Sequence, residues 1–250
     1  MTAQTDPVAP VSDERDALIA EILEGLRRTL VHYGLWYREV EHQLGPEEAT
    51  RIEAEAGDRA IAIILKRLAE LLGFELEDGV PKALREKSVE DLKALQRGVA
   101  VNWLANDGVW FQAVENRHGM DCAKRANDTC WAYFSPYEAR RIRNELGLGE
   151  NSGLEGLKAA LGRRMYAHIN RQSIEELDEH TVIFRMNECR VQSARHRKGL
   201  ADYPCKSGGI VEYPTFAAAI DPRIETECLG CPPDPHPEEW LCAWKFTLKP

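Results

Sequence analysis

The feature that most constrains the fold is a change of hydrophobic periodicity in the last third of the chain. Up to about residue 177, apolar residues recur every three or four positions, as in amphipathic helices. In 180–189, Val182, Phe184 and Met186 instead alternate with other residues, which predicts a half-buried strand. RIETECL and LCAWKFTL predict two more strands, and VQSARHRKGL and TFAAAI predict two short helices. We expect an α+β fold in which an N-terminal helical part packs on a C-terminal antiparallel sheet with short helices.

The helical part is expected to contain several long helices separated by glycine, proline or capping residues. The predicted helices are 12–42 with Ser12 as cap, 46–72, 88–119 with Ser88 as cap, 120–134, a new helix opened by Ser135 and Pro136, and 154–177. Helices 12–42 and 46–72 are expected to form an antiparallel hairpin, and 74–87 to be irregular. We divide the chain into a disordered tail (1–11), a helical part with a candidate ligand pocket (12–150) and an α+β cysteine-rich metal-binding part (151–250).

Composition and charge limit the possible partners and compartment. The 250 residues carry a formal net charge of −9, which argues against nucleic acid or an anionic membrane surface as the main partner. Residues 1–16 lack the pattern of a secretory signal, and no apolar run approaches the ~20 residues of a spanning helix. We therefore expect a cytoplasmic protein, whose clustered thiols in a reducing compartment are metal ligands or redox groups.

The last quarter of the chain holds five of the seven cysteines. These are Cys189, Cys205, Cys228, Cys231 and Cys242. Cys228 and Cys231 form a CxxC, which supplies two sulfurs from one tight turn, and a hairpin through PPDPHPEE would return Cys242 beside them. The set predicts a metal site, with zinc as the first expectation and an iron–sulfur cluster as the alternative. Redox or persulfide chemistry at the CxxC and purely structural thiols remain as other interpretations.

The remaining cysteines and two histidines carry weaker expectations. Cys122 and Cys130 lie in a helical stretch without a CxxC partner and are expected to be packing residues. His196 and His236 are auxiliary metal-ligand candidates, although a lone surface histidine is more often solvated.

A second constellation lies in the helical part, within NWLANDGVWFQAVENRHG and KRANDTCW. It combines acids, amides and large aromatic residues. We name Asp107 and Glu115 as candidate catalytic bases, and Asn106, Trp110, Asn127 and Trp131 as candidate ligand-binding residues. The alternative is that the aromatic residues are core and the acids are solvated. If a ligand binds, we expect this constellation to face the cysteines.

The order of residues in the cysteine-rich part resembles a known domain. The segments MxxC, PCK, AIDPRI, ECLxCPP and CxWxF follow one another as in the C-terminal part of the 4-vinyl reductase domain. They are also similar to bacterial proteins of unknown function related to 2-amino-thiazoline-4-carboxylate hydrolase. The resemblance covers Phe184 to Leu248 and implies zinc ligands at Cys205, Cys228 or Cys231, and Cys242, with Cys189 matching in some members. The PPDPHPEE insertion and the additional CxxC cysteine depart from the pattern.

Three functions follow from these patterns. The first is a metal-containing enzyme acting on a small molecule, such as a hydrolase of a C–N or C–S bond, with an open metal position near Asp107. The second is a zinc-stabilised small-molecule sensor or accessory protein without turnover. The third is a sulfur or redox protein that uses Cys228 and Cys231. The N-terminal helices also make a homodimer an expectation.

Overall fold

The computed structural model describes residues 13–197, 199 and 202–250. The predicted tail (1–11) and the predicted cap Ser12 lie outside these residues. The chain divides into two compact units, residues 1–56 and 57–250. No helix in the described part of the chain is long and apolar enough to cross a membrane.

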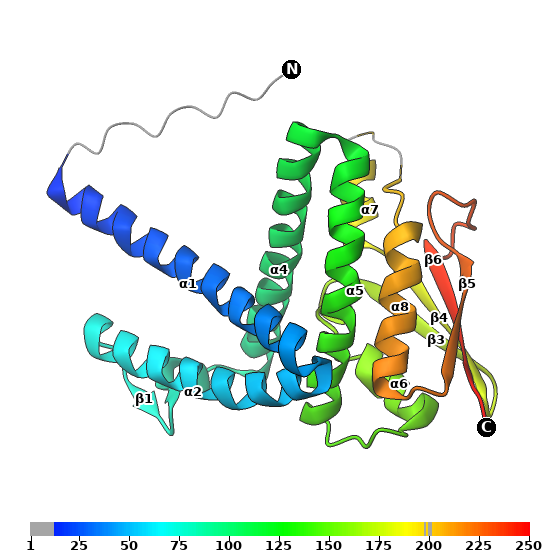
Figure 1. Ribbon diagram of the computed structural model, residues 1–250, viewed down its shortest axis with the longest axis horizontal. Coiled ribbons are helices and arrows are strands. Elements are labelled where there is room, and N and C mark those ends of the chain that lie inside the picture. The colour runs from blue at the N-terminus through cyan, green and yellow to red at the C-terminus, as the bar shows by residue number, and fades with distance from the viewer. Residues whose placement is uncertain (1–12, 198, 200–201) are drawn as a thin grey trace. The chain divides into compact units, whose positions relative to one another are not determined.

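The first unit contains α1 (Glu14–Leu44) and the first turns of α2 (Pro46–Leu72) (Figure 1). The side chain of Asp13 caps α1 by accepting a hydrogen bond from the backbone N–H of Arg15, and Gly45 ends the helix with a φ of 85°. The predicted bounds of both helices are therefore confirmed to within a few residues. Helix α1 contacts α2 through Tyr33, whose hydroxyl donates to Glu53 Oε1 at 2.8 Å, but no residue of α1 is buried in this structure.

The second unit begins with the remainder of α2 and continues into two long helices. It contains the short hairpin of β1 (Leu76–Glu77) and β2 (Val80–Pro81), then α3 (Lys82–Arg85), α4 (Val89–His118) and α5 (Met120–Glu145). The predicted cap is confirmed, because Ser88 Oγ accepts from the backbone N–H of Asp91 at 3.1 Å. Helix α4 runs unbroken through Gly108.

Helix α5 corrects the predicted break at Ser135 and Pro136. It is continuous, with Pro136 inside it. An internal proline removes one backbone hydrogen bond and costs ~3 kcal/mol. Burial on both sides of the proline offsets this cost, since Trp131, Ser135, Ala139 and Ile142 are all buried.

The region after α5 also differs from the predicted helix 154–177. It forms α6 (Gly153–Leu161), a 3-10 turn (Met165–His168) and strand β3 (Arg171–Asp178). Strand β3 is an edge strand with mostly exposed residues, so its sequence lacks the apolar alternation by which a strand is recognised.

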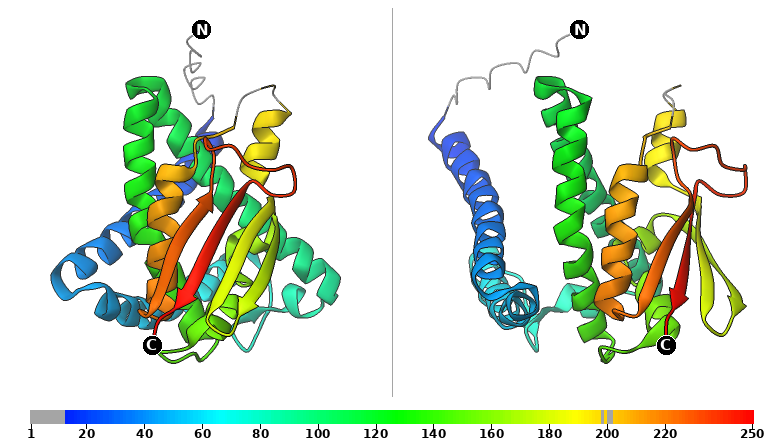
Figure 2. Two further views of the ribbon diagram at one scale, coloured as in Figure 1. Left: turned by 90° about the vertical axis from the view of Figure 1, so that its right-hand side faces the viewer. Right: turned by 45° about the vertical axis from the view of Figure 1, so that its right-hand side comes forward.

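The C-terminal sheet is antiparallel with the strand order β3-β4-β6-β5, as the left view of Figure 2 shows. The other strands are β4 (Thr181–Glu188), β5 (Ile224–Gly230) and β6 (Cys242–Leu248), all at predicted positions. The short helix α7 (Arg190–His196) is confirmed, whereas α8 (Lys206–Ile220) is longer than the short helix predicted from TFAAAI.

Helix α8 is the centre of the second unit, lying between α5 and the sheet (Figure 2, right). Val182, Phe184 and Met186 of β4 are buried beneath it, which confirms the predicted alternation. A glycine allows the close approach of helix and sheet: a Cβ on Gly209 would lie 2.6 Å from the Trp244 ring. The mixed α+β class, with helices first and an antiparallel sheet last, is thus confirmed.

Candidate functional site

A cavity of about 420 Å³ lies within the second unit. We call it the central cavity. Its walls come from α4, α5, the 3-10 turn, α7, α8 and the ends of β4 and β6. A space of this size fits a small organic molecule. The cavity brings together residues from both constellations that the sequence singled out: Asp107, Glu115, Asn127, Trp131, Cys189, Cys205, Cys231 and Cys242.

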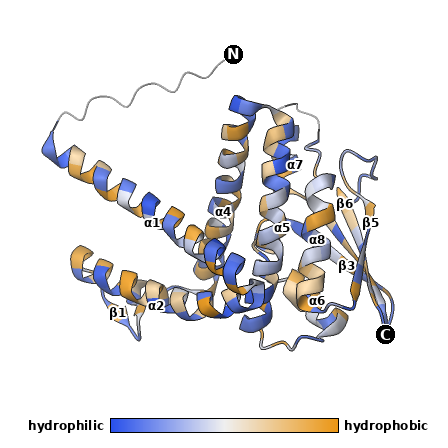
Figure 3. Ribbon diagram, viewed as in Figure 1, coloured by the Kyte–Doolittle hydropathy of each residue, from blue (hydrophilic) through white to orange (hydrophobic). Residues whose placement is uncertain are grey.

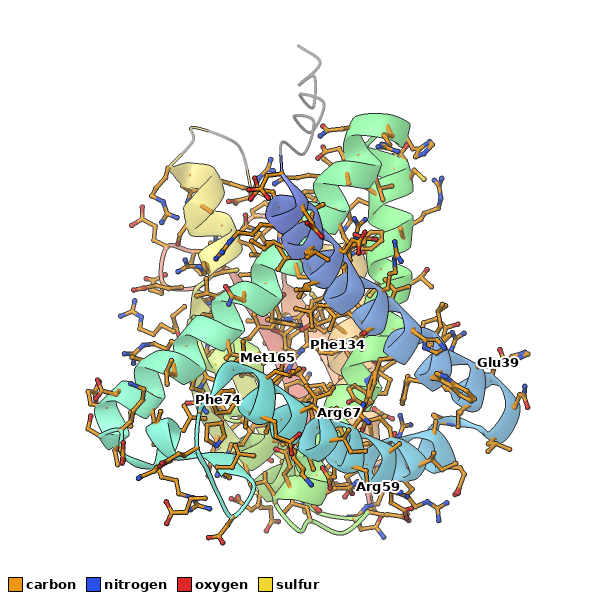
Figure 4. The ribbon with its side chains drawn as sticks, turned by 90° about the vertical axis from the view of Figure 1, so that its left-hand side faces the viewer. Glu39, Arg59, Arg67, Phe74, Phe134 and Met165 are labelled. Carbon is orange, nitrogen blue, oxygen red and sulfur yellow. The ribbon has the colours of Figure 1, made fainter. Side chains whose placement is uncertain are left out.

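Aromatic rings, including those of Trp131 and Tyr166, form part of the apolar wall, and further rings pack behind them. Trp131 stacks on Tyr166 with ring centroids 5.6 Å apart, and Trp103 packs edge-on against both rings. Phe134, labelled in Figure 4, continues this cluster on α5. Trp131 is only 6% exposed and also lines the cavity, so it serves as core and wall together. Such rings provide flat apolar surface for a ligand.

Four free thiols line one wall of the central cavity. Cys189 precedes α7, Cys205 precedes α8, Cys231 follows β5 and Cys242 begins β6. Burial raises the pKa of Cys189 to about 11, and burial with the neighbouring Cys189 and Cys242 holds the pKa of Cys205 well above its usual value. These thiols are therefore protonated near neutral pH unless a cation binds them.

Cys242 is the exception among the buried thiols. Its pKa is lowered, first by the hydrogen bond from Cys231 and further by the Trp244 indole and the Tyr213 hydroxyl, despite its burial. The hydrogen bond with Cys242 correspondingly raises the pKa of Cys231.

The sulfurs share a wall without converging on one point. Among the described residues, no group of three or more His, Cys, Asp or Glu side chains stands in an arrangement that could hold a metal ion. Cys228 is half-buried and does not line the central cavity, because the CxxC turn places only Cys231 toward it. Chemically, the donor set matches zinc, which prefers thiolates. The side chains as the structure places them, however, do not form a zinc site.

The opposite wall carries an acid and an amide in contact. Asn127 Nδ2 donates to Asp107 Oδ1 at 3.0 Å, which joins α4 to α5. Burial raises the pKa of Asp107, while Asn127 and Lys124 oppose the rise. A half-buried acid with a raised pKa at a cavity wall is typical of a proton-transfer residue. Glu115 also lines the cavity, about two helical turns further along α4.

A buried ion network behind the cavity was not predicted from the sequence. The side chain of Arg164 is 1% exposed, with Nε 2.8 Å from Glu138 Oε2 and a terminal nitrogen 2.7 Å from Glu212 Oε1. Burial opposes its charge, but the two carboxylates outweigh burial and raise the pKa of Arg164. Burial raises the pKa of Glu212, which lines the cavity. The sequence held a signal, because Glu212 is the one acid in the apolar run GGIVEYPTFAAAI.

Gln192 is a second residue that the sequence did not indicate. Its amide is 1% exposed and holds the segment before α8. It donates to the Tyr203 carbonyl at 2.9 Å, accepts from the Tyr203 N–H at 2.8 Å and contacts Cys205 Sγ at 3.2 Å. Gln192 therefore fixes the position of one thiol in the wall.

The remaining predicted residues lie elsewhere. Asn106 is exposed and Trp110 is 65% exposed, and neither lines the central cavity, because both lie on the face of α4 opposite the centre of its cavity-lining face. Cys122 and Cys130 are outside the cavity on α5. The two histidines both contact Asp202: His196 Nε2 lies 2.5 Å from Oδ1 and His236 Nε2 lies 3.2 Å from Oδ2.

Comparison with known proteins places the chain in a family but gives no activity. No curated protein and no solved structure matches it. A family model matches residues 11–88 and 85–248, nearly the whole chain, and the chain belongs to this family of unknown function, DUF6125.

Proposed function

We propose that this protein binds a small molecule in the central cavity, beside a zinc ion held by thiols of its wall. The observation that carries the proposal is the presence of Cys189, Cys205, Cys231 and Cys242 in one cavity with aromatic walls. These thiols come from four separate places in the last quarter of the chain, so the fold gathers them at a ligand-sized space. A purely packing role would not require a shared cavity.

Zinc is the proposed metal because thiolates are its preferred ligands and it needs no redox partner. Cys205, Cys231 and Cys242 are the proposed ligands, and Cys189 is the fourth candidate. Binding requires these side chains to turn about χ1 toward a common point and to release their protons. A zinc ion with an open coordination position would supply Lewis acidity to a bound molecule.

For a reaction, we assign proton transfer to Asp107. Its raised pKa and its hydrogen bond from Asn127 support this role more than any property of Glu115. The proposed reaction class is hydrolysis of a C–N or C–S bond, which the resemblance of the cysteine-rich part implies. An accessory or sensor protein without turnover would use the same cavity and would not depend on Asp107.

Metal analysis of anaerobically purified full-length protein tests the proposal. We expect about one zinc per chain and a colourless solution. Cys231→Ser and Cys242→Ser should each lose most of the zinc, whereas Cys130→Ser, an exposed thiol outside the cavity, should keep it. Zinc retained by both cavity variants, or no metal in the wild type, contradicts the zinc part. A brown protein with absorbance near ~400 nm would replace zinc by an iron–sulfur cluster.

The neighbouring positions of Cys231 and Cys242 in the cavity wall, with the pKa of Cys242 lowered and that of Cys231 raised, favour a second candidate function in thiol–disulfide exchange. In this reaction the two thiols form one S–S bond and lose two protons and two electrons, while a small-molecule disulfide is reduced to two thiols. We assign this role to Cys231 and Cys242 in place of the CxxC pair, because both line the cavity and Cys228 does not. A metal-free protein whose Cys231–Cys242 disulfide forms in a glutathione redox buffer would favour it over zinc binding.

A further inference from the structure

The N-terminal part of α1 presents an apolar stripe that its own unit, residues 1–56, leaves exposed. Its large aliphatic side chains between residues 18 and 31 are between 47% and 77% exposed. They are Leu18, Ile19, Ile22, Leu23, Leu26, Leu30 and Val31. Figure 3 shows the apolar bands along this helix. A stripe of this size is far more than scattered surface hydrophobics and indicates an interaction surface.

The spacing of the stripe is that of a coiled-coil seam. Ile19, Leu23, Leu26, Leu30 and Tyr33 follow one another at intervals of four, three, four and three residues. The same alternation continues through Tyr37 and Val40 to Leu44, but Tyr33 already donates to Glu53 of α2 at 2.8 Å, so the part of the seam open to a partner is residues 19–30. A 3.5-residue period keeps one narrow seam facing a partner helix over several turns. The expected partner is therefore another helix with the same period.

The charges of α1 favour a second copy of α1 in the opposite direction. Residues 14–24 contain four acidic residues and one basic residue, whereas residues 25–35 contain two arginines and no acid. In an antiparallel pair with its two-fold axis beside residues 24 and 25, the acidic segment 14–24 of each copy lies opposite the basic segment 25–35 of the other. This register places Ile19 opposite Leu30 of the partner subunit and Leu23 opposite Leu26 of the partner subunit. A parallel pair would instead face like charges with like.

Ion pairs within the helix do not remove this preference. Arg27 and Arg28 each contact Glu24 at 3.4 and 3.3 Å, but their side chains are 78% exposed. Such exposed pairs contribute little and leave the arginines able to face a partner. The charge pattern therefore remains available to a partner helix.

The exposed area is sufficient for a weak, specific dimer. Seven half-exposed aliphatic side chains offer on the order of 500 Å² per protomer. A symmetric pair then buries roughly 1,000 Å², which is at the lower limit for a specific interface. We infer that α1 pairs with α1 of a second copy as an antiparallel coiled coil through Ile19, Leu23, Leu26 and Leu30.

Sedimentation velocity of the full-length protein over a concentration series tests the pairing. We expect a monomer–dimer equilibrium with a dissociation constant on the order of 10 μM. The double variant Leu23→Glu/Leu26→Glu should raise that constant at least ~100-fold, because it places charges in the seam. Leu35→Glu is the matched control: Leu35 is 61% exposed but lies roughly 160° around the helix from the seam, so the dimer should persist.

Two further measurements separate the alternatives. Added salt should weaken an antiparallel dimer, since it screens attractive charges, and dimerisation that strengthens with salt overturns the antiparallel register. Circular dichroism must show that the seam variant keeps the wild-type helix content. A wild type that stays monomeric at about 200 μM, or a dimer indifferent to the seam variant, overturns the inference, and amide protection of α1 in such a monomer would assign the stripe to its own chain. None of these outcomes depends on the thiols or the cavity.

Discussion

Helices α1 and α8 are both rich in apolar residues, yet one is bare and the other is enclosed. Helix α8 is apolar on nearly all sides and lies between α5 and the sheet, with Phe216, Ala217 and Ile220 fully buried. Helix α1 has an apolar stripe on an otherwise charged surface and no buried residue. The contrast shows that apolar pattern determines which face of a helix needs cover, whereas the covering surface is set by long-range packing.

Truncating one side chain in each helix gives the largest expected difference. Phe216→Ala removes a side chain with no exposed surface and should lower the free energy of unfolding by about 3 to 5 kcal/mol. Leu26→Ala removes one that is 53% exposed and should change it by less than about 0.5 kcal/mol. Both values come from urea unfolding at a protein concentration low enough to keep the chain monomeric. Equal losses in the two variants would show that α1 is covered within its own chain.

The ion network of Arg164, Glu138 and Glu212 tests the same difference between enclosed and exposed side chains with charged residues. Arg164→Met leaves Glu138 and Glu212 buried without a cation and should cost about 3 kcal/mol of unfolding free energy. This cost is at the lower end of the range for a broken buried ion pair, because burial already raises the pKa of Glu212 and this carboxyl can take up a proton.

A triple variant isolates the charges in this network. Adding Glu138→Gln and Glu212→Gln to Arg164→Met should recover part of the loss, because no buried charge remains. Lys158→Met removes a surface cation that pairs with Glu155 and Glu176 and should leave urea unfolding unchanged. An Arg164→Met protein as stable as the wild type would contradict the description of this network as buried and coupled.

The fold was predictable where the sequence pattern and the burial coincide. Val182, Phe184 and Met186 alternate because only one face of β4 is buried. Strand β3 lacks that alternation, since it is an exposed edge, and was predicted as helix. The proline inside α5 was predicted as a break because local propensity opposes it, and only tertiary packing, absent from a local pattern, retains the helix.

The candidate site was predictable by residue type more than by geometry. Spacing pointed to Cys231 and Cys242, but it gave Cys228 the same weight, and the turn points only Cys231 into the cavity. Helical phase explains why Asp107 lines the cavity while its neighbour Asn106 does not. Gln192 gave no signal, because its role depends on contacts with a loop eleven residues away that no local pattern encodes.

The smallest effect concerns Asp221, which ends α8 and joins it to α6. Its carboxylate accepts from the Gly153 N–H at 2.9 Å and pairs with Arg223 at 2.7 Å. The hydrogen bond from Arg223 is the main reason that the pKa of Asp221 is lowered to about 2.

A lowered folded-state pKa determines the sign of the pH dependence. An unfolded aspartate titrates near ~3.9, so the stabilisation by Asp221 is fully present above that pH and is lost as the pH falls toward about 2. Arg223 is 40% exposed and partly screened, so we expect only about 1 kcal/mol. Urea unfolding should show Asp221→Asn less stable than the wild type at pH ~6, with the difference narrowing below pH ~3.9 and closing only below pH ~2. A difference that persists unchanged at low pH would mean that Asp221 stabilises this junction by packing and not by its charge.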